Sequence, residues 1–199
     1  MNIIGISEGF HDGALALISG SKILYASHSE RYSRIKNDKW IHSDQWPKSK
    51  RYQPDVVAYY EKPFKKNLRR WWAGQSWQKP RLDYDVSFSH HESHAAAGFY
   101  TSTFDECNVL VVDAIGEWDT ISIWRGRDDK LKKITSWKYP YSLGLLYSAV
   151  TQRIGLKPNE DEYITMGMAA FGQPLYVKEL EEQLWENNHR GLGDFFPNA

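Results

Sequence analysis

Apolar and polar residues alternate in three short runs at the start of the chain. These runs predict β-strands at Asn2–Ser7, at Ala14–Ser19 and at residues 22–26. Gly13 and Gly20 stand where the chain must turn between them. Strands joined this closely predict a β-meander.

Between residues 30 and 100 the pattern alternates between helical and extended periods. It predicts a helix starting at 30–36, strands at 56–60 and 86–89, and helices at Pro63–Trp72 and 91–100. Ser89 precedes the last of these helices, and serine is a favoured N-cap residue. The alternation indicates an α/β protein.

The pattern of the first meander recurs about a hundred residues later. In both residues 4–12 and residues 111–119, an apolar strand runs into a polar loop that ends in Asp. Further strands are predicted after each copy, at 120–125 and 131–136 in the second. We therefore expect two similar lobes, 1–104 and 105–199, with both polar loops directed into a cleft between them.

The second predicted lobe lacks the returning strands of the first. After its meander, the spacing of apolar residues predicts an amphipathic helix over 142–154, which Gly155 ends. A Met-, Ala- and Gly-rich segment at 166–172, an acidic helix at 175–186 and a loop at 191–199 follow. We expect this lobe to be incomplete.

The formal net charge of zero conceals a basic stretch. Residues 31–81 hold 14 Lys or Arg and 4 Asp or Glu, an excess of ten positive charges. Five tryptophans are interspersed among them: Trp40, Trp46, Trp71, Trp72 and Trp77. This composition allows nucleic-acid binding by phosphate contacts and stacking, but a solvated surface is the preferred interpretation because no nucleic-acid-binding module is recognisable.

The sequence contains neither a secretory leader nor an apolar run long enough to span a membrane. Its single cysteine cannot form an internal disulfide. We expect a cytoplasmic protein.

Two histidines four residues apart form the sharpest chemical signal. On a helix, His90 and His94 lie on the same face and could bind one metal ion. The alternative is that they cap or pack as neutral imidazoles. Glu92 stands two positions after His90, whereas in zinc proteases the glutamate directly follows the first histidine. The spacing thus disfavours a protease.

Asp113 is a candidate third ligand because it ends an apolar strand, where a carboxylate would otherwise be out of place. Two imidazoles and one carboxylate leave coordination positions open for iron(II), zinc or manganese. A turn-forming Asp is the alternative. A metal-dependent hydrolase on another fold would use the same ligands.

The first loop places His11 and Asp12 between two strands. His11 could serve as a general base, or it could be an ordinary loop histidine. Further on, Arg31, Arg34 and Lys36 group three cations that suit phosphate, although a charged helix face explains them equally well.

Taken together, these motifs resemble the carbamoyltransferase family that includes nodulation-factor, cephamycin and tobramycin O-carbamoyltransferases. Six blocks in family order carry the resemblance: residues 5–14, 30–38, 89–97, 112–117, 142–148 and 166–172. The resemblance implies an N-terminal domain of the actin-like, ribonuclease H-like superfamily (ASKHA) with duplicated lobes.

The resemblance also implies an activity. In the family, a second domain makes carbamoyl-adenylate from carbamoyl phosphate and ATP, and the actin-like domain transfers the carbamoyl group to a hydroxyl. By motif, His90, His94 and Asp113 match the ligands of an iron-type metal that holds the adenylate. His11 and Asp12 match the loop beside the reacting group. The nucleotide cleft is matched by Lys36, Gly116, Glu117, Gly167 and Gly172.

This chain departs from the family pattern at Asn37, where a histidine is usual, and at Ile164, where a lysine is usual. It is also expected to end before a further metal-ligating Asp and before the adenylate-forming domain, which a second chain could supply. A catalytically incomplete metal- and nucleotide-binding module is therefore an alternative. Loops 37–53 and 71–81 match no family pattern, and we expect them to select the small-molecule or sugar acceptor.

Overall fold

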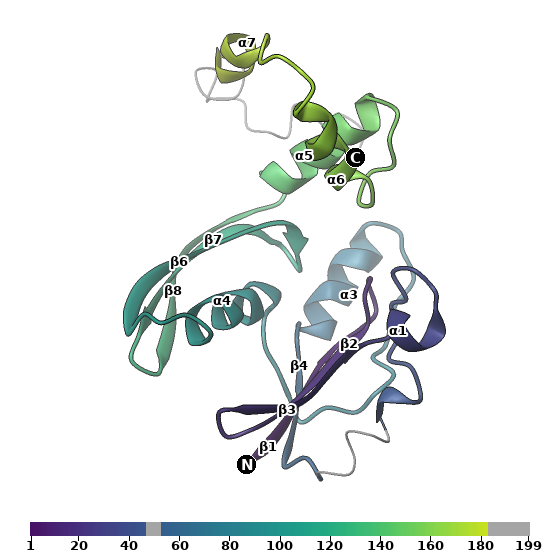
Figure 1. The fold of residues 1–199 in the computed structure, drawn as a ribbon, viewed down its shortest axis with the longest axis vertical. Coiled ribbons are helices and arrows are strands. Elements are labelled where there is room, and N and C mark those ends of the chain that lie inside the picture. Colours follow the sequence, from purple (N-terminus) through teal and green to yellow (C-terminus); the bar gives the residue numbers. More distant parts are fainter. Residues whose placement is uncertain (47–52, 183–199) are drawn as a thin grey trace. The chain divides into compact units, whose positions relative to one another are not determined.

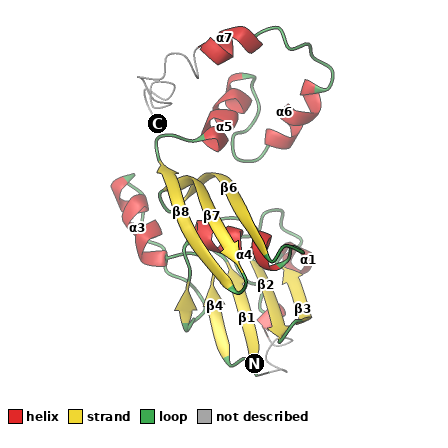
Figure 2. Cartoon of the chain, turned by 90° about the vertical axis from the view of Figure 1, so that its left-hand side faces the viewer, coloured by secondary structure: helices red, strands yellow, loops and turns green. Residues whose placement is uncertain are grey.

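The computed structural model describes residues 1–46 and 53–182. The chain divides into two compact units, Met1–Ala97 and the described residues from Gly98 onward. The division falls within helix α4 (His90–Tyr100). Figure 1 shows the order of the elements, and Figure 2 distinguishes strands from helices. The mixed α/β class predicted from the sequence is confirmed.

The first unit is built on a five-stranded mixed sheet of order β3-β2-β1-β4-β5. Its strands are β1 (Asn2–Ser7), β2 (Ala14–Ser19), β3 (Lys22–His28), β4 (Val56–Tyr59) and β5 (Val86–Ser87). The first three form the predicted antiparallel meander, whereas β4 and β5 add in parallel beyond β1. Strand β3 is two residues longer than predicted and ends at His28.

The core of this unit lies on one face of β1 and β2. Ile4 and Ile6 alternate with less buried neighbours and pair with Leu17 and Leu15 across the ladder. With Tyr59 they form a buried cluster in which no side chain is more than 3% exposed. Full burial of such an aliphatic side chain contributes roughly 1.5–3 kcal/mol, so this ladder anchors the unit.

Helices α1 and α3 precede α4 in the described part of the first unit. Helix α1 (Glu30–Ser33) is a single turn, shorter than the sequence predicts, because Arg34 adopts a left-handed conformation with φ of 60°. Helix α3 (Pro63–Trp72) begins with proline, which fits the first turn of a helix.

The second unit contains an antiparallel meander of β6 (Glu106–Gly116), β7 (Asp119–Arg127) and β8 (Lys130–Lys138). Meanders therefore occur at both predicted positions. The actin-like duplication of lobes, with the second lobe incomplete, stays a prediction, as do the lobe boundaries.

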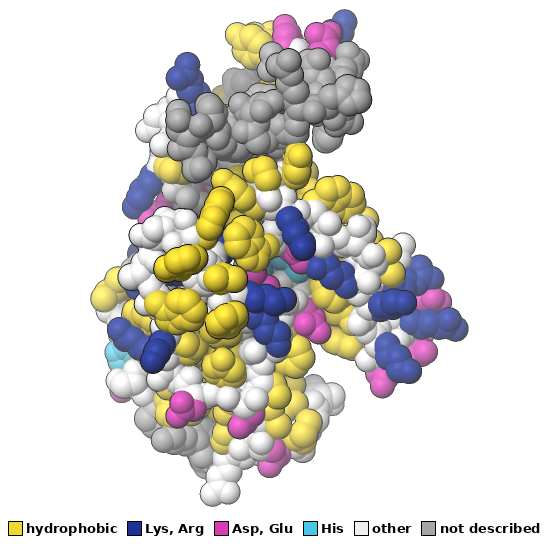
Figure 3. All heavy atoms as spheres, turned by 180° about the vertical axis from the view of Figure 1, so that it is seen from behind, with side chains coloured by type: hydrophobic (Ala, Val, Ile, Leu, Met, Phe, Trp, Pro, Cys, Tyr) yellow, Lys and Arg dark blue, Asp and Glu magenta, His cyan; other side chains and the backbone are white. Residues whose placement is uncertain are grey.

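The end of α4 packs on one face of this second sheet. A Cβ on Gly126 would lie only 2.4 Å from the Phe99 ring, so glycine is required at this contact. The strands also carry exposed apolar side chains, with Leu110 at 64%, Val112 at 50% and Trp137 at 46%. Figure 3 shows one face of the molecule on which hydrophobic side chains gather with Lys and Arg among them.

Up to residue 182, where the described residues end, the sheet is followed by helices α5 (Leu143–Arg153), α6 (Glu162–Ala169) and α7 (Val177–Glu181). The Ser148 hydroxyl donates to Glu162 at 2.6 Å, and the hydroxyls of Thr151 and Thr165 are 2.9 Å apart, so α5 and α6 are joined by polar contacts. The predicted acidic helix corresponds to α7 in its described part. The predicted loop 191–199 lies outside the described residues.

Among the described residues, every helix is too short or too polar to cross a membrane.

Gly144 allows α5 to approach β6 closely. A Cβ at this position would lie 2.6 Å from the backbone N and Cα of Ala114. We expect Gly144→Ala to lower the free energy of unfolding by about 1–3 kcal/mol, because the backbone must move apart. Urea denaturation measures this change.

Gly167→Ala is the matched control. Gly167 also lies in a helix, but an added Cβ there would meet no atom within 4 Å. This substitution should be neutral or should raise the unfolding free energy by up to about 1 kcal/mol, through helix propensity alone. Equal losses in both variants would disprove the contact argument.

The Ser148–Glu162 contact predicts a pH dependence. Partial burial raises the pKa of Glu162, but hydrogen bonds from Ser148 and from the backbone N–H of Asn159 outweigh it and hold the pKa below its usual value. The resulting stabilisation is present above the unfolded pKa of about 4.3 and disappears as the pH falls below it. Ser148→Ala should therefore reduce the loss of stability between about pH 6 and about pH 3, followed by chemical denaturation at each pH.

Candidate functional site

The loop after β1 brings His11 and Asp12 into contact. Nδ1 of His11 lies 2.8 Å from Oδ2 of Asp12, with both side chains partly exposed. If Asp12 accepts a hydrogen bond from Nδ1–H, Nε2 of His11 keeps its lone pair and is available as a base. Asp12 has a positive φ of 49°, a conformation that Asp tolerates better than most residues.

Two backbone hydrogen bonds fasten this loop. Gly9 N donates to Lys39 O at 2.7 Å, and Gly13 N donates to Asp38 O at 2.6 Å. A Cβ on Gly13 would lie 2.8 Å from the carbonyl carbon of Trp40, so only glycine permits the approach. The loop that carries His11 is thereby held by residues almost thirty positions away.

Helix α4 presents the predicted histidine pair. Ser89 and Glu92 form a capping box, in which Glu92 accepts from Ser89 N at 3.2 Å and Ser89 Oγ accepts from Glu92 N at 3.4 Å. The helix consequently begins at His90. The Nε2 atoms of His90 and His94 are 3.0 Å apart, so both imidazoles point toward one place.

Asp113 lies inside β6, three residues before its end, and not at the strand end predicted from the sequence. The pairing of β6 with β7 is irregular between Val112 and Gly116, and this irregularity explains how a polar residue is accommodated. Oδ1 of Asp113 accepts from the backbone N–H of Ala114 at 2.7 Å.

Ser142 is a positioning residue for which sequence reasoning proposed no role. Its hydroxyl donates to Ala114 O at 2.6 Å and accepts from Leu145 N at 3.0 Å, so it caps α5 and fastens β6 at once. Together with the close approach of Gly144, this contact fixes the backbone that carries Asp113.

The remaining predicted residues lie on several different elements of the two units. Lys36 is exposed after α1. Gly116 pairs with Asp119 at the turn from β6 to β7, and the adjacent Glu117 is 8% exposed with φ of 27°. Gly167 lies in α6, and Gly172 follows that helix.

The basic, aromatic stretch is divided between packing and exposure. Trp40 lies under the Arg81 guanidinium at 4.1 Å, and Trp46 packs against the core. Trp71, Trp72 and Trp77 are at least half exposed. Only part of the predicted stacking surface is therefore available.

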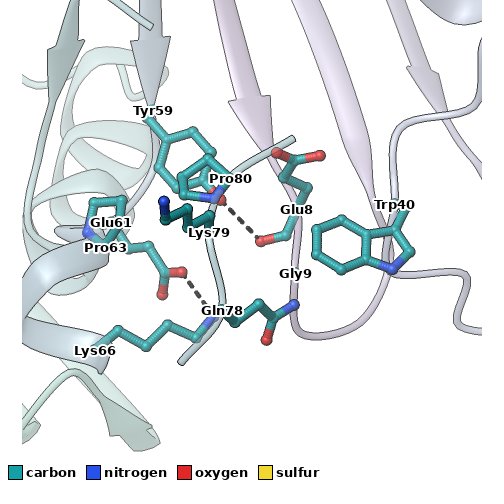
Figure 4. Close-up of a pocket in the computed structure, with 10 residues that line it drawn as sticks. All are labelled: Glu8, Gly9, Trp40, Tyr59, Glu61, Pro63, Lys66, Gln78, Lys79 and Pro80. Carbon is teal, nitrogen blue, oxygen red and sulfur yellow. Dashed lines mark hydrogen bonds and ion pairs between the residues drawn. The ribbon is translucent and has the colours of Figure 1, made fainter. Parts of the chain in front are cut away.

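A small pocket lies within the first unit and was not predicted (Figure 4). Its lining residues come from the end of β1, from β4 and α3, and from two loops: Glu8, Gly9, Trp40, Tyr59, Glu61, Pro63, Lys66, Gln78, Lys79 and Pro80. One lining residue, Gly9, belongs to the loop that also carries His11.

Buried charges surround this pocket. Lys66 and Glu61 form an ion pair of 2.6 Å with side chains 10% and 6% exposed. Glu8 is 1% exposed, and its Oε1 accepts from Arg81 N at 2.7 Å. Burial, reinforced by the charges of Glu8 and Glu61, raises the pKa of Tyr59 well above its usual value, so this phenol stays protonated and donates to Glu8 O at 3.2 Å.

The buried pair predicts an asymmetric response to substitution. Lys66→Met should lower the free energy of unfolding by about 3–5 kcal/mol, because it leaves the Glu61 carboxylate buried without its cation. Guanidinium denaturation measures this loss. The control Lys65→Met removes an exposed cation from the same helix and should change the value by less than about 0.5 kcal/mol. Similar effects of both substitutions would disprove the role of the ion pair.

Comparison with known proteins relates this chain to one family. The family model described as the carbamoyltransferase N-terminus matches residues 45–192. The uncharacterised protein sll1178 of Synechocystis is 32% identical over 92% of this chain and 37% of its own length. The nodulation protein NolNO of Sinorhizobium fredii is 30% identical over 88% of this chain and 30% of its own.

The chain therefore spans about a third of the length of these relatives. Among solved structures, a Ppx/GppA family member from Aquifex aeolicus matches with a TM-score of 0.39 and 15% identity, covering 92% of this chain and 61% of that one.

Proposed function

Because this chain belongs to the carbamoyltransferase family, as its N-terminal part, we propose that it takes part in transfer of a carbamoyl group from carbamoyl-adenylate to a hydroxyl. The observation that carries the proposal is the His11–Asp12 contact of 2.8 Å on a fastened loop. Such a pair is suited to remove a proton from an alcohol near neutral pH.

In the proposed step, Asp12 accepts a hydrogen bond from Nδ1–H of His11. This bond fixes the tautomer and the orientation of the imidazole. Nε2 of His11 then takes the proton of the acceptor hydroxyl as its oxygen bonds to the carbamoyl carbon. The bond from that carbon to the phosphate oxygen breaks, and AMP leaves with the electron pair. The partial exposure of both side chains leaves room for substrate.

We propose His90, His94 and Asp113 as ligands of a divalent metal, most suitably iron, with zinc or manganese as alternatives. The donor set supports this assignment, since the two imidazole nitrogens converge to 3.0 Å. Bound there, the metal would supply a Lewis acid for charge that develops on the adenylate oxygens. Ser142 and Gly144 would hold the backbone of Asp113 in place.

The nucleotide side of the reaction is assigned by motif. We propose that Lys36, Gly116, Glu117, Gly167 and Gly172 contact carbamoyl-adenylate, within an actin-like arrangement of two lobes. Carbamoyl phosphate and ATP would be used by an adenylate-forming domain, in the same longer protein or in a second chain.

The small pocket beside the His11 loop marks the part of the surface that we propose the acceptor contacts. Its wall includes Trp40 from loop 37–53 and Gln78 from loop 71–81, the two loops expected to select the acceptor.

The metal assignment makes a direct prediction. Protein purified without chelator should contain metal at the His90 site, and His90→Ala and Asp113→Ala should each contain about one equivalent less metal than the wild type, because two remaining ligands hold a divalent ion poorly. Elemental analysis by mass spectrometry measures the content.

His42→Ala is the control, since His42 lies outside the proposed site and stacks on Tyr32. It should retain the metal. A well-folded wild-type protein with no metal bound at this site would overturn the transferase assignment for this chain and favour the catalytically incomplete binding module.

A further inference from the structure

A second group of metal-ligating side chains lies wholly within the first unit. One ligand atom from each of Asp12, His28 and Glu30 lies within 4.8 Å of the other two. We propose that these three residues form a second divalent-cation site, separate in its ligands from the site proposed at His90 and His94.

The fold brings these residues together from three elements. Asp12 lies in the loop after β1, His28 is the last residue of β3, and Glu30 is the first residue of α1. Ala14 pairs with His28 across the β2–β3 ladder, and Ser29 N donates to Gly13 O at 2.7 Å. Backbone hydrogen bonds therefore hold the loop that carries Asp12 against the end of β3, next to His28 and Glu30.

The histidine supplies an independent observation. Nδ1 of His28 is inaccessible to solvent and makes no hydrogen bond with any residue that the structure describes. Desolvating such a group without a partner costs on the order of 1–3 kcal/mol, so native proteins usually satisfy it. A cation bound at Nδ1 would give this atom the partner that it lacks among the described residues.

The carboxylates retain capacity for a ligand. Glu30 accepts one hydrogen bond, from Asn37 N to Oε2 at 3.2 Å, and Asp12 accepts one from His11. Each carboxylate has roughly four lone-pair positions, so coordination does not require either bond to break. Two anionic groups this close together repel each other, and a divalent cation removes that repulsion.

The donor set indicates the class of ion. Two carboxylates and one imidazole suit Mn²⁺ or Zn²⁺ better than a thiolate-selecting ion or an all-oxygen calcium site. Three protein ligands leave positions for water or substrate oxygen. Because Asp12 also contacts His11, the ion would restrain the loop that carries the proposed base.

Mn²⁺ binding tests the proposal. The full chain, stripped with chelator, is titrated with Mn²⁺ while electron paramagnetic resonance reports the free ion. His28→Gln and Glu30→Gln should each raise the dissociation constant of one site at least about tenfold. His90→Ala should leave that site intact, so failure of the transferase metal site and failure of this one are distinguishable.

Asp83→Asn removes an exposed carboxylate of the same unit and should leave Mn²⁺ binding unchanged. Mn²⁺ should also raise the melting temperature of the wild type and of Asp83→Asn, but less that of Glu30→Gln, whose near-identical shape preserves folding. Unchanged Mn²⁺ affinity in folded His28→Gln and Glu30→Gln would overturn the proposal.

Discussion

The close approach of the backbone at Gly13 to the segment around Asp38 is the constraint on which the first unit's chemistry depends. An added Cβ would overlap Trp40, and the Gly13–Asp38 hydrogen bond would be lost with the approach. This contact restrains the loop after β1, which would otherwise be a flexible hairpin connection. The buried ladder of β1 and β2 supports it from below, since Ile6 and Leu15 pair at the end of the strands next to the loop. The core and the backbone contacts therefore restrain the loop and the side chains on it, and catalytic sites require such restraint.

Patterns of short range predicted most of the fold. The period-two alternation gave both meanders, because a strand with one buried face must alternate. Element ends were less predictable, since distant partners determine them. Strand β3 continues to His28 because β2 pairs with it as far as Ala14, and α1 stops at Ser33 because Arg34 turns left-handed. Neither the extension of β3 nor the end of α1 could be predicted from the neighbouring residues in the sequence.

In the candidate site too, features set by short-range spacing were predictable, whereas features set by distant contacts were not. The spacing of His90 and His94 predicted that they share a helix face, because four residues make about one helical turn. The position of Asp113 was predicted less well, since its strand continues through an irregularity held by Ser142 from almost thirty residues away. The pocket with its Glu61–Lys66 pair was not predicted at all. Burial of a charge pair is a property of the tertiary fold, and a Lys in a basic helix gives no sign of it.

Asp12 occupies the centre of this arrangement because its carboxylate can serve two neighbours. One oxygen contacts His11, and one ligand atom of Asp12 lies within 4.8 Å of a ligand atom from His28 and of one from Glu30. A carboxylate bound on one side only could rotate and lose its alignment with the imidazole, whereas one held on both sides cannot do so without breaking a second interaction. Orientation of a base by a restrained acceptor is a general means of keeping a catalytic tautomer in place. A cation bound by Asp12, His28 and Glu30, as we propose, would hold the carboxylate from this second side and so support the proposed proton transfer.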